Sequence, residues 1–275
     1  MNARIDKIRF GPWALVTGAS SGIGREFAQQ LAANGINLVL AARRRPLLEE
    51  VGRTLTQRYG VQHRVVEADC YRPDLVDKLA EATAGLDIGL VVSNAGTGEP
   101  GQFLKKDRES LLKIARLNAL SHLEIAHYFG GRLAQRGRGG LLFGGAMGAI
   151  HGLPFMAGDS ASKAFVQALG EALHVEFQPL GVNVTVLVIG PTDTAIIPKF
   201  GLDPSTMPMK LMQPEQCVRE GLNALVKNRS AYIPGRTNRV MNAIMPASVA
   251  RRMMGKMLGG AAAKPGSVLG KRAAT

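Results

Sequence analysis

An acid and a lysine stand one helical turn apart in FMAGDSASKAF, residues 155–165, where Asp159 precedes Lys163 by four positions. Helical periodicity over residues 157–178 places both side chains on one side of a helix. A carboxyl group has an ordinary pKa of about 3.9, so a proton donor at neutral pH would need a pKa about three units higher. Lys163 acts in the opposite direction, because a neighbouring cation favours the carboxylate. We therefore expect Asp159 to be an anion, a poor acid and a weak base.

The sequence VTGASSGIGREFAQQL offers a site for a phosphate group. Gly18 permits a tight turn, Gly22 lets the backbone approach a pyrophosphate, and Gly24 lets the following helix pack closely on the strand. Free N–H groups at the start of that helix attract the anion. We expect a dinucleotide site built on this turn, with contacts from Gly18, Ser20, Ser21, Gly22, Ile23 and Gly24.

The end of the next strand indicates which dinucleotide is bound. Chains that bind NAD commonly place an acid there, which holds the ribose 2′-hydroxyl, whereas this chain reads LVLAARRRP with Arg43, Arg44 and Arg45. A guanidinium group binds a 2′-phosphate through two hydrogen bonds. We therefore expect NADP(H), held by Arg43 and Arg44, and expect one or two of the three arginines to be solvated surface charges.

These residues lie between elements that alternate along the chain. Apolar runs in WALVTG, INLVLAA, HRVVEAD and DIGLVVSNAG, and at 140–145, 182–190 and 230–235, predict strands. Segments of helical period separate them, including residues 107–136. Strands that are apolar throughout are covered on both faces, which predicts an α/β fold with one doubly wound parallel sheet, a Rossmann domain. We assign it residues 1–257, followed by a flexible basic C-terminal tail, 258–275.

Composition narrows the class of protein. The chain has 275 residues, 46% of them hydrophobic, and a formal net charge of +13. Residues 236–275 hold eight Lys or Arg and no Asp or Glu, so more than half of the excess charge lies there. The remaining basic residues form no stripe with interleaved aromatic residues, which argues against nucleic-acid binding. Cys70 and Cys217 form no metal or disulfide pattern. We therefore expect no metal site. Because the N-terminus lacks a signal sequence, we expect a cytoplasmic protein.

The C-terminal segment RVMNAIMPASVARRMMGKML leaves two interpretations open. Its alternation of apolar and basic residues suits peripheral contact with an anionic membrane or with a partner. It equally suits a helix packed on its own domain. Pro246 interrupts the pattern and argues against one continuous amphipathic helix.

Over residues 11–235 the chain resembles the short-chain dehydrogenase/reductase family. TGASSGIG matches the family's TGxxxGxG turn, Asn94-Ala95-Gly96 matches its NAG motif, and IGPTDT at 189–194 resembles its PGxxxT loop. The resemblance implies that an adenine contact falls on Asp69 and its neighbour Cys70, and that an active-site asparagine is Asn118. It also implies cofactor contacts from Asn94, Ala95, Gly96, Lys163, Gly190, Thr192 and Thr194.

The resemblance breaks at two of the four catalytic positions. Lys163 matches the lysine of the family's YxxxK motif, but Asp159 stands where the family has tyrosine. The family's serine position falls on Gly145 or Ala146, depending on the alignment. The catalytic candidates are therefore Asn118, Asp159 and Lys163.

Three interpretations follow from these departures. The chain transfers hydride with a proton from water, His151 or Tyr128; or it reduces an iminium-type cation, which an anionic Asp159 would stabilise. Alternatively it binds NADP(H) without turnover, as a structural or regulatory subunit, and Asp159 pairs with Lys163 or caps the helix. We expect an oxidoreductase that acts on a hydrophobic carbonyl or imine-like substrate.

The remaining expectations concern shape and assembly. Residues 195–214 are rich in Met, Ile and Phe and contain Pro and Gly, which predicts a mobile roof over an apolar substrate pocket. The resemblance implies a homodimer or homotetramer formed through helix 157–178. Small side chains on that helix would permit close approach; they are Ala161, Ala164, Ala168 and Ala172.

Overall fold

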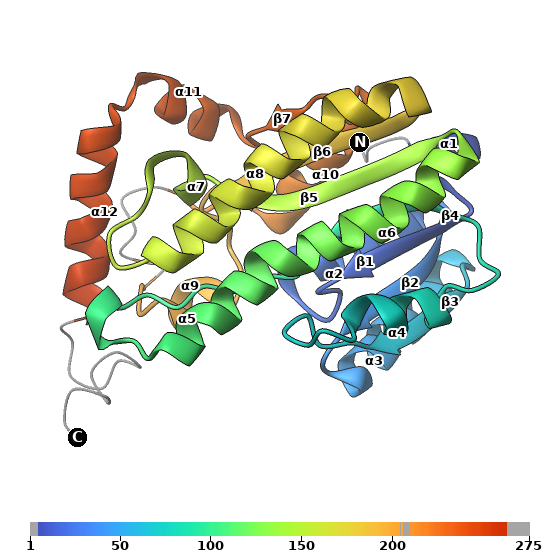
Figure 1. The fold of residues 1–275 in the computed structure, drawn as a ribbon, viewed down its shortest axis with the longest axis horizontal. Coiled ribbons are helices and arrows are strands. Elements are labelled where there is room, and N and C mark those ends of the chain that lie inside the picture. Colours follow the sequence, from blue (N-terminus) through green and yellow to red (C-terminus); the bar gives the residue numbers. More distant parts are fainter. Residues whose placement is uncertain (1–4, 204, 206–209, 263–275) are drawn as a thin grey trace.

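Seven parallel strands form the sheet at the centre of the computed structural model, which describes residues 5–203, 205 and 210–262. Their order across the sheet is β3-β2-β1-β4-β5-β6-β7. The predicted doubly wound parallel sheet is confirmed (Figure 1). The strands are β1 (Trp13–Thr17), β2 (Asn37–Ala42), β3 (His63–Glu67), β4 (Ile88–Ser93), β5 (Gly139–Ala146), β6 (Val182–Ile189) and β7 (Ala231–Tyr232).

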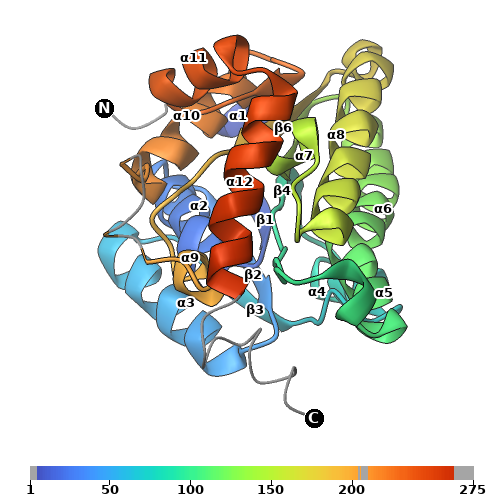
Figure 2. The ribbon, with the colours of Figure 1, turned by 90° about the vertical axis from the view of Figure 1, so that its left-hand side faces the viewer.

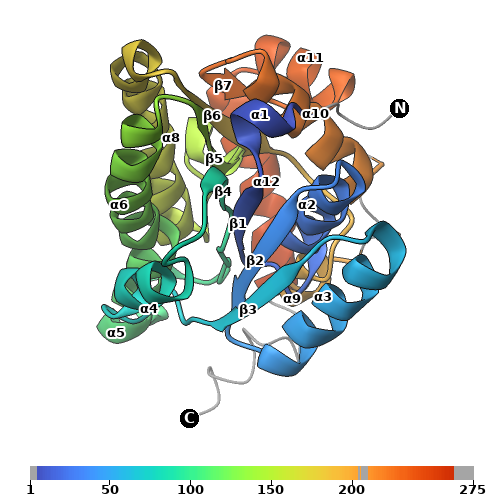
Figure 3. The same cartoon turned by 90° about the vertical axis from the view of Figure 1, so that its right-hand side faces the viewer.

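Helices cover both faces of the sheet, as Figures 2 and 3 show from opposite sides. One face carries α2 (Gly22–Ala33), α3 (Arg45–Tyr59) and α10 (Pro214–Val226), and the other carries α4 (Leu75–Ala82), α6 (Ser121–Arg136) and α8 (Ala157–Phe177). Strand residues alternate between the two cores: Leu38 and Leu40 belong to the first, Val39 and Ala41 to the second. This double burial is why the strands read as continuous apolar runs.

The chain reverses its direction of winding between β1 and β4. Loops that leave the carboxyl ends of these two strands diverge to opposite faces, and in sheets of this kind ligands bind in the crevice between them. Thr17 at the end of β1 holds the crevice together, because its Oγ1 accepts hydrogen bonds from the N–H groups of Asn94 and Ala95, both at 3.0 Å.

The helix predicted over residues 107–136 is divided in the structure. It consists of α5 (Arg108–Ala115), a π-helical turn η2 (Arg116–Leu120) and α6. The turn contains Asn118, whose side-chain amide bonds both backbone groups of Thr97 in a separate loop. Such a turn widens the helix locally and is frequent at functional sites.

The C-terminal segment forms two helices, α11 (Arg236–Ile244) and α12 (Ala247–Ala262), which Pro246 separates. Helix α12 crosses in front of the carboxyl ends of the strands (Figure 2). One side of this segment packs on its own domain, since Leu258 is buried. Helix α12 continues to Ala262, past the boundary predicted at residue 257; residues 263–275 of the predicted tail lie outside the described residues.

Short elements complete the chain. They are α1 (Lys7–Phe10), η1 (Phe103–Lys105), α7 (Gly148–His151), η3 (Gln178–Leu180) and α9 (Ile196–Lys199). Within the described ranges, no helix is both long and apolar enough to cross a membrane.

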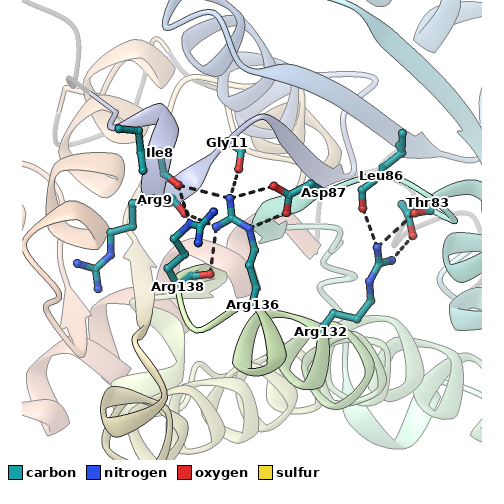
Figure 4. A network of polar contacts seen from close by, with 9 residues as sticks. All are labelled: Ile8, Arg9, Gly11, Thr83, Leu86, Asp87, Arg132, Arg136 and Arg138. Atoms are coloured by element: carbon teal, nitrogen blue, oxygen red, sulfur yellow. Dashed lines mark hydrogen bonds and ion pairs between the residues drawn. The ribbon is translucent and has the colours of Figure 1, made fainter.

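Arginines on α6 and just after it bind the segments that precede β1 and β4, at the amino-terminal ends of these strands (Figure 4). Arg136 pairs with Asp87 at 2.6 Å and donates to the carbonyl oxygen of Arg9, also at 2.6 Å. Arg132 donates to the carbonyl oxygen of Leu86 at 2.9 Å. These guanidinium groups satisfy backbone carbonyls at chain ends and turns, so part of the basic charge has a structural use inside the fold.

Candidate active site

A cavity of about 580 Å³ lies at the carboxyl ends of the strands. All the predicted cofactor contacts and the three catalytic candidates, Asn118, Asp159 and Lys163, line it. His151 also lines the cavity, whereas Tyr128 lies partly exposed on α6 against Phe129 and outside the lining. Within the described part of the chain, no group of three or more His, Cys, Asp or Glu side chains is placed to hold a metal.

The glycine-rich turn has the backbone that a close approach to a phosphate requires. Gly18 and Gly22 have φ values of +70° and +55°, which favour glycine. A Cβ added at Gly24 would lie 2.2 Å from the carbonyl oxygen of Gly18, so only glycine fits there. The strand, turn and helix therefore pack as the dinucleotide motif requires.

The arginines after β2 have different surroundings. Arg44 Nη2 donates to the hydroxyls of Ser20 at 3.2 Å and Ser21 at 3.3 Å, so the guanidinium group lies against the glycine-rich turn. Arg43 stacks on the ring of Tyr71 at 5.4 Å. Arg45 instead pairs with Glu49 on the surface of α3 and is absent from the cavity lining. Arg43 and Arg44 thus both line the cavity near the glycine-rich turn, and their charges fit a dinucleotide that carries a ribose 2′-phosphate.

The loop after β3 also lines the cavity, through Asp69, Cys70 and Tyr71. Asp69 Oδ1 accepts a hydrogen bond from the N–H of Tyr71 at 3.1 Å, which fixes the loop. Burial, and then the charge of Asp69, raise the pKa of the Cys70 thiol to about 12. Cys70 is therefore a protonated, unreactive thiol at neutral pH.

Asp159 is buried in the first turn of α8, with 6% of its surface exposed. Its Oδ1 accepts a hydrogen bond from the N–H of Glu99 at 3.1 Å. Burial raises the pKa of Asp159 to about 6, against the opposing effects of Lys106 and of the Glu99 N–H. The expectation that the pKa of Asp159 would not be raised is wrong, because desolvation outweighs the nearby cations. The carboxyl group is still mostly ionised at neutral pH.

Lys163 does not form an ion pair with Asp159. Its Nζ donates to the carbonyl oxygen of Gly144 at 2.6 Å, and the ion pairs found among the described residues do not include Asp159 with Lys163. Burial lowers the pKa of Lys163 to about 8, although the charge of Asp159 acts in the opposite direction. The lysine is thus a partly buried cation, and among the described residues its Nζ has one backbone acceptor.

Asn118 reaches the same place from the π-helical turn. Its Oδ1 accepts from the N–H of Thr97 at 3.1 Å, and its Nδ2 donates to the carbonyl oxygen of Thr97 at 2.8 Å. A Cβ added at Gly96 would lie 3.2 Å from Asn118 Oδ1 and 3.1 Å from Lys163 Nζ. Gly96 therefore leaves room for the amide and the ammonium group to approach the same point.

The position of the missing serine is decided by packing. A Cβ at Gly145 would lie 2.8 Å from Val186 Cγ1, so a larger side chain would not fit there. Ala146 lines the cavity and is partly exposed, which makes it the position where a hydroxyl would reach a ligand. This chain presents a methyl group at that point.

The loop after β6 is held by its own hydroxyls. Thr192 Oγ1 donates to the carbonyl oxygen of Gly190 at 2.9 Å, and Thr194 Oγ1 donates to that of Thr192 at 3.5 Å. A Cβ at Gly190 would lie 2.7 Å from Asn238 Nδ2, so this loop and α11 pack closely.

The apolar walls of the cavity come from two parts of the chain. The predicted roof contributes Ile196, Ile197, Phe200 and Leu202; residues 204 and 206–209 of it lie outside the described residues. Helices α11 and α12, which the sequence left unassigned to the site, contribute the second wall. Seven methionines line the cavity: Met147, Met156, Met241, Met245, Met253, Met254 and Met257.

His122 beneath the site was not identified from the sequence. Its Nδ1 lies 2.7 Å from Ser93 Oγ, while its Nε2 has no hydrogen-bond partner among the described residues. Burial, and then the charge of Lys163, lower the pKa of His122 well below its ordinary value, so the ring is neutral. The sequence signal that could have identified His122 is its position four residues after Asn118, which places both side chains on the same side of the helix.

Comparisons with known proteins agree with this geometry. The family model described as short chain dehydrogenase matches residues 12–203. A very-long-chain 3-oxoacyl-CoA reductase of Neurospora crassa is 37% identical over 229 residues, 82% of this chain and 68% of that protein. A 7beta-hydroxysteroid dehydrogenase of Clostridium sardiniense is 30% identical over 232 residues, 84% of this chain and 88% of that protein.

Solved structures give the same result. A 7beta-hydroxysteroid dehydrogenase structure superposes with a TM-score of 0.82 at 28% identity and covers 93% of this chain and all of its own. A short-chain dehydrogenase from Sphingobium yanoikuyae in complex with NADPH gives a TM-score of 0.77 at 27% identity, over 92% of this chain and 96% of that one.

Proposed function

Since the chain belongs to the short-chain dehydrogenase/reductase family, we propose that it is an NADP(H)-dependent oxidoreductase acting on a hydrophobic carbonyl or imine-like substrate. The observation that carries the proposal is the pair of charges formed by buried Asp159 and partly buried Lys163, which line the same cavity as the glycine-rich turn. The relatives' activities support an oxidoreductase, and the non-standard Asp159 is the feature that this chain adds.

The cofactor is proposed from the arginines. Arg44 lies against the turn that would hold the pyrophosphate, and Arg43 lies beside it over Tyr71. No acid stands at the end of β2, where Ala42 lines the cavity. When bound, the nicotinamide supplies the hydride; the chain binds the phosphates and orients the ring.

Asp159 has two possible chemical uses, and its pKa decides how each depends on pH. In the protonated form it donates a proton to a carbonyl oxygen, and with a pKa of about 6 protonation at neutral pH costs only about 1.4 kcal/mol. In the ionised form it stabilises a substrate cation, such as an iminium, by Coulomb attraction inside the apolar cavity. Ala146 offers no hydroxyl to hold a carbonyl oxygen, which favours the cation.

The cavity suits a bulky apolar substrate. Methionine side chains are flexible and polarisable and adapt to irregular ligands, and seven of them surround the space beyond Asp159. Relatives of this chain bear the names of enzymes for long acyl chains and for steroids. A large, mostly apolar molecule with a single reacting C=O or C=N group is the substrate class that we propose.

A specific observation favours a second candidate, a protein that binds NADP(H) without turnover. Asp159 and Asn118 both bond backbone groups of the loop at 97–99, at Glu99 and Thr97 respectively. Side chains engaged in this way can be purely structural. The protein would then act as a structural or regulatory subunit.

The test follows NADPH absorbance with the purified protein against bulky ketones, enones and cyclic imines. We expect turnover of at least one class, and Asp159→Asn should lower kcat/KM by about a hundredfold. Asp77→Asn, which makes the same change at an exposed position of α4 outside the cavity lining, serves as the control. Silence across the panel, with NADPH binding intact in a titration, would support the second candidate.

Cofactor choice is tested separately by calorimetry. Arg44→Ala should weaken NADPH binding by about tenfold or more and leave NADH binding within about twofold, because only NADPH carries the 2′-phosphate. Arg45→Ala, which removes the surface partner of Glu49, is the matched control and should change neither affinity. Equal losses for both nucleotides in Arg44→Ala would contradict the assignment.

We also propose two interactions, one with further copies of this chain and one with a membrane surface. Exposed apolar residues on α8 and its small-residue face support a homodimer or homotetramer, as the family resemblance implies. The outer side of α11 and α12 combines exposed Ile244 and Val249 with Arg252 and Lys256, which supports peripheral contact with an anionic membrane. Flotation with phosphatidylserine vesicles, with phosphatidylcholine vesicles as control, tests the latter.

A further inference from the structure

One side of α12 rests on the connection between α7 and α8. Arg251 Nη1 donates to the carbonyl oxygen of His151 at 3.1 Å. Gly255 and Gly259 follow Arg251 at intervals of four residues, so all three positions lie on one side of the helix. This side differs from the one that carries Met254 into the cavity.

The two glycines permit a close approach. A Cβ added at Gly255 would lie 3.3 Å from Pro154 Cγ, and a Cβ added at Gly259 would lie 3.0 Å from Phe155 Cε2. Both distances are shorter than ordinary van der Waals contact, so a Cβ at either position requires Pro154 or Phe155 to shift, and a branched side chain requires a larger shift. Neither glycine has a positive φ, so the backbone itself does not require glycine there.

Phe155 stands at the point where this packing reaches the reacting groups. Its φ is +64°, an uncommon conformation for a bulky residue, which persists only when the surroundings hold it. Its carbonyl oxygen accepts a hydrogen bond from the N–H of Gly101 at 2.7 Å. Two residues earlier in that loop, Glu99 donates its N–H to Asp159 Oδ1 at 3.1 Å. The loop is thus fixed at one point to the turn and at another to the catalytic candidate.

We propose that Phe155 is a positioning residue, and that α12, packed on Pro154 through Gly255 and on Phe155 through Gly259, holds the loop at 99–101 over Asp159. The packing, the left-handed residue and the two hydrogen bonds form one continuous chain of contacts. Helix α12 thereby does more than wall the cavity: its seating keeps the carboxyl group buried. The catalytic consequence rests on the proposed function, whereas the mechanical coupling does not.

Hydrogen exchange of individual amides, measured by NMR on the full chain, tests the coupling without any turnover. In Gly259→Val the amides of Glu99 and Gly101 should exchange at least about tenfold faster than in the wild type, although they lie far away in sequence. The amide of Gly60, which bonds Thr56 in α3, should not change. Arg252→Val places the same side chain on the exposed side of α12 and should leave both loop amides unchanged.

A second variant distinguishes loss of the contact with Phe155 from unfolding of α12. Phe155→Gly removes the ring and accepts the positive φ without strain, and it should also accelerate exchange at Gly101. Adding Gly259→Val to Phe155→Gly should then have little further effect on exchange, because each change alone already removes the same contact between α12 and Phe155. Unchanged exchange at Glu99 and Gly101 in Gly259→Val, or fully additive effects in the double variant, would overturn the proposal.

Catalysis supplies a separate readout. If the protein turns over, unseating α12 exposes Asp159, so the pH at which activity changes should fall from about 6 toward the ordinary carboxyl range. A protein that shows the exchange coupling but no turnover would refute the proposed function and leave the positioning role standing.

Discussion

Asp159 is an ionised carboxyl group held where burial disfavours its charge. Its pKa is raised from an ordinary 3.8 to about 6, so the ionised form destabilises the fold at neutral pH. Because the folded pKa is the higher one, this cost is present above about pH 6 and disappears as the pH falls below about 4. A stability measurement therefore reports directly on the environment of this residue.

We predict that Asp159→Asn raises the free energy of unfolding by about 2–3 kcal/mol at neutral pH and by almost nothing near pH 4. Asparagine keeps an oxygen that accepts the Glu99 N–H while it removes the charge. Urea denaturation at the two pH values measures the difference. Asp77→Asn, an exposed change on α4, should alter stability by less than about 0.5 kcal/mol at either pH. An equal gain at both pH values would show that charge burial is not its cause.

Ala146 makes the second prediction at this scale. If the substrate is a carbonyl compound, Ala146→Ser supplies a hydroxyl beside the reacting oxygen and should raise kcat/KM by about tenfold. If the substrate is an iminium cation, the added hydroxyl has no oxygen to hold and the rate should change by less than about threefold. Gly145→Ser, which meets Val186, should instead lower thermal stability.

The sequence could group the candidate site residues because their spacing is local. The glycine turn, the arginines after β2 and the Asp159–Lys163 interval are each short patterns, and all these residues line one cavity except Arg45. The direction of the Asp159 pKa shift was beyond reach, because it depends on burial beneath a loop 60 residues away in the chain.

At the scale of elements, α12 is the part of the site with the least warning in the sequence. Its inward residues, Ala250, Met254, Met257 and Leu258, follow helical spacing, but the same pattern suits a membrane surface. The choice between the two depends on the close approach at Gly255 and Gly259, which is a tertiary contact. The strands, in contrast, are set by apolar runs and were predicted within a few residues. The π-helical turn escaped prediction because Asn118 bonds Thr97, which lies in a different loop.

We predict that the double variant Met254→Gln and Met257→Gln raises KM for an apolar substrate by about tenfold or more, because two polar amides then face an apolar ligand. The Kd for NADPH should stay within about twofold. Steady-state kinetics and a fluorescence titration give the two values. Val249→Gln, on the exposed side of α12 and outside the lining, should change neither. A parallel loss of NADPH affinity would mean that α12 supports the nucleotide rather than the substrate.

At the scale of the molecule, two faces remain open to partners. One is the outer side of α6 and α8, where Phe165 is 41% exposed and Leu123 and Val175 are also exposed. The other is the outer side of α11 and α12. Composition alone does not locate either face. The net charge of +13, for example, includes Arg132 and Arg136, which bind other groups of the fold.

We predict that Phe165→Glu converts a dimer or tetramer to a smaller species in sedimentation velocity, because a charge on this apolar face opposes burial. Ile8→Glu changes a side chain that is 77% exposed on α1, and the assembly should persist. Identical sedimentation of Phe165→Glu and the wild type would place the interface elsewhere.

The pH profile of hydride transfer, compared between the wild type and Asp159→Asn, tests the central claim most directly. The wild-type profile of kcat/KM should break near pH 6, rising toward acid for a carbonyl substrate and falling toward acid for an iminium substrate. The break should vanish in Asp159→Asn. The same break in both proteins would show that another group controls the reaction and would contradict the role given to Asp159.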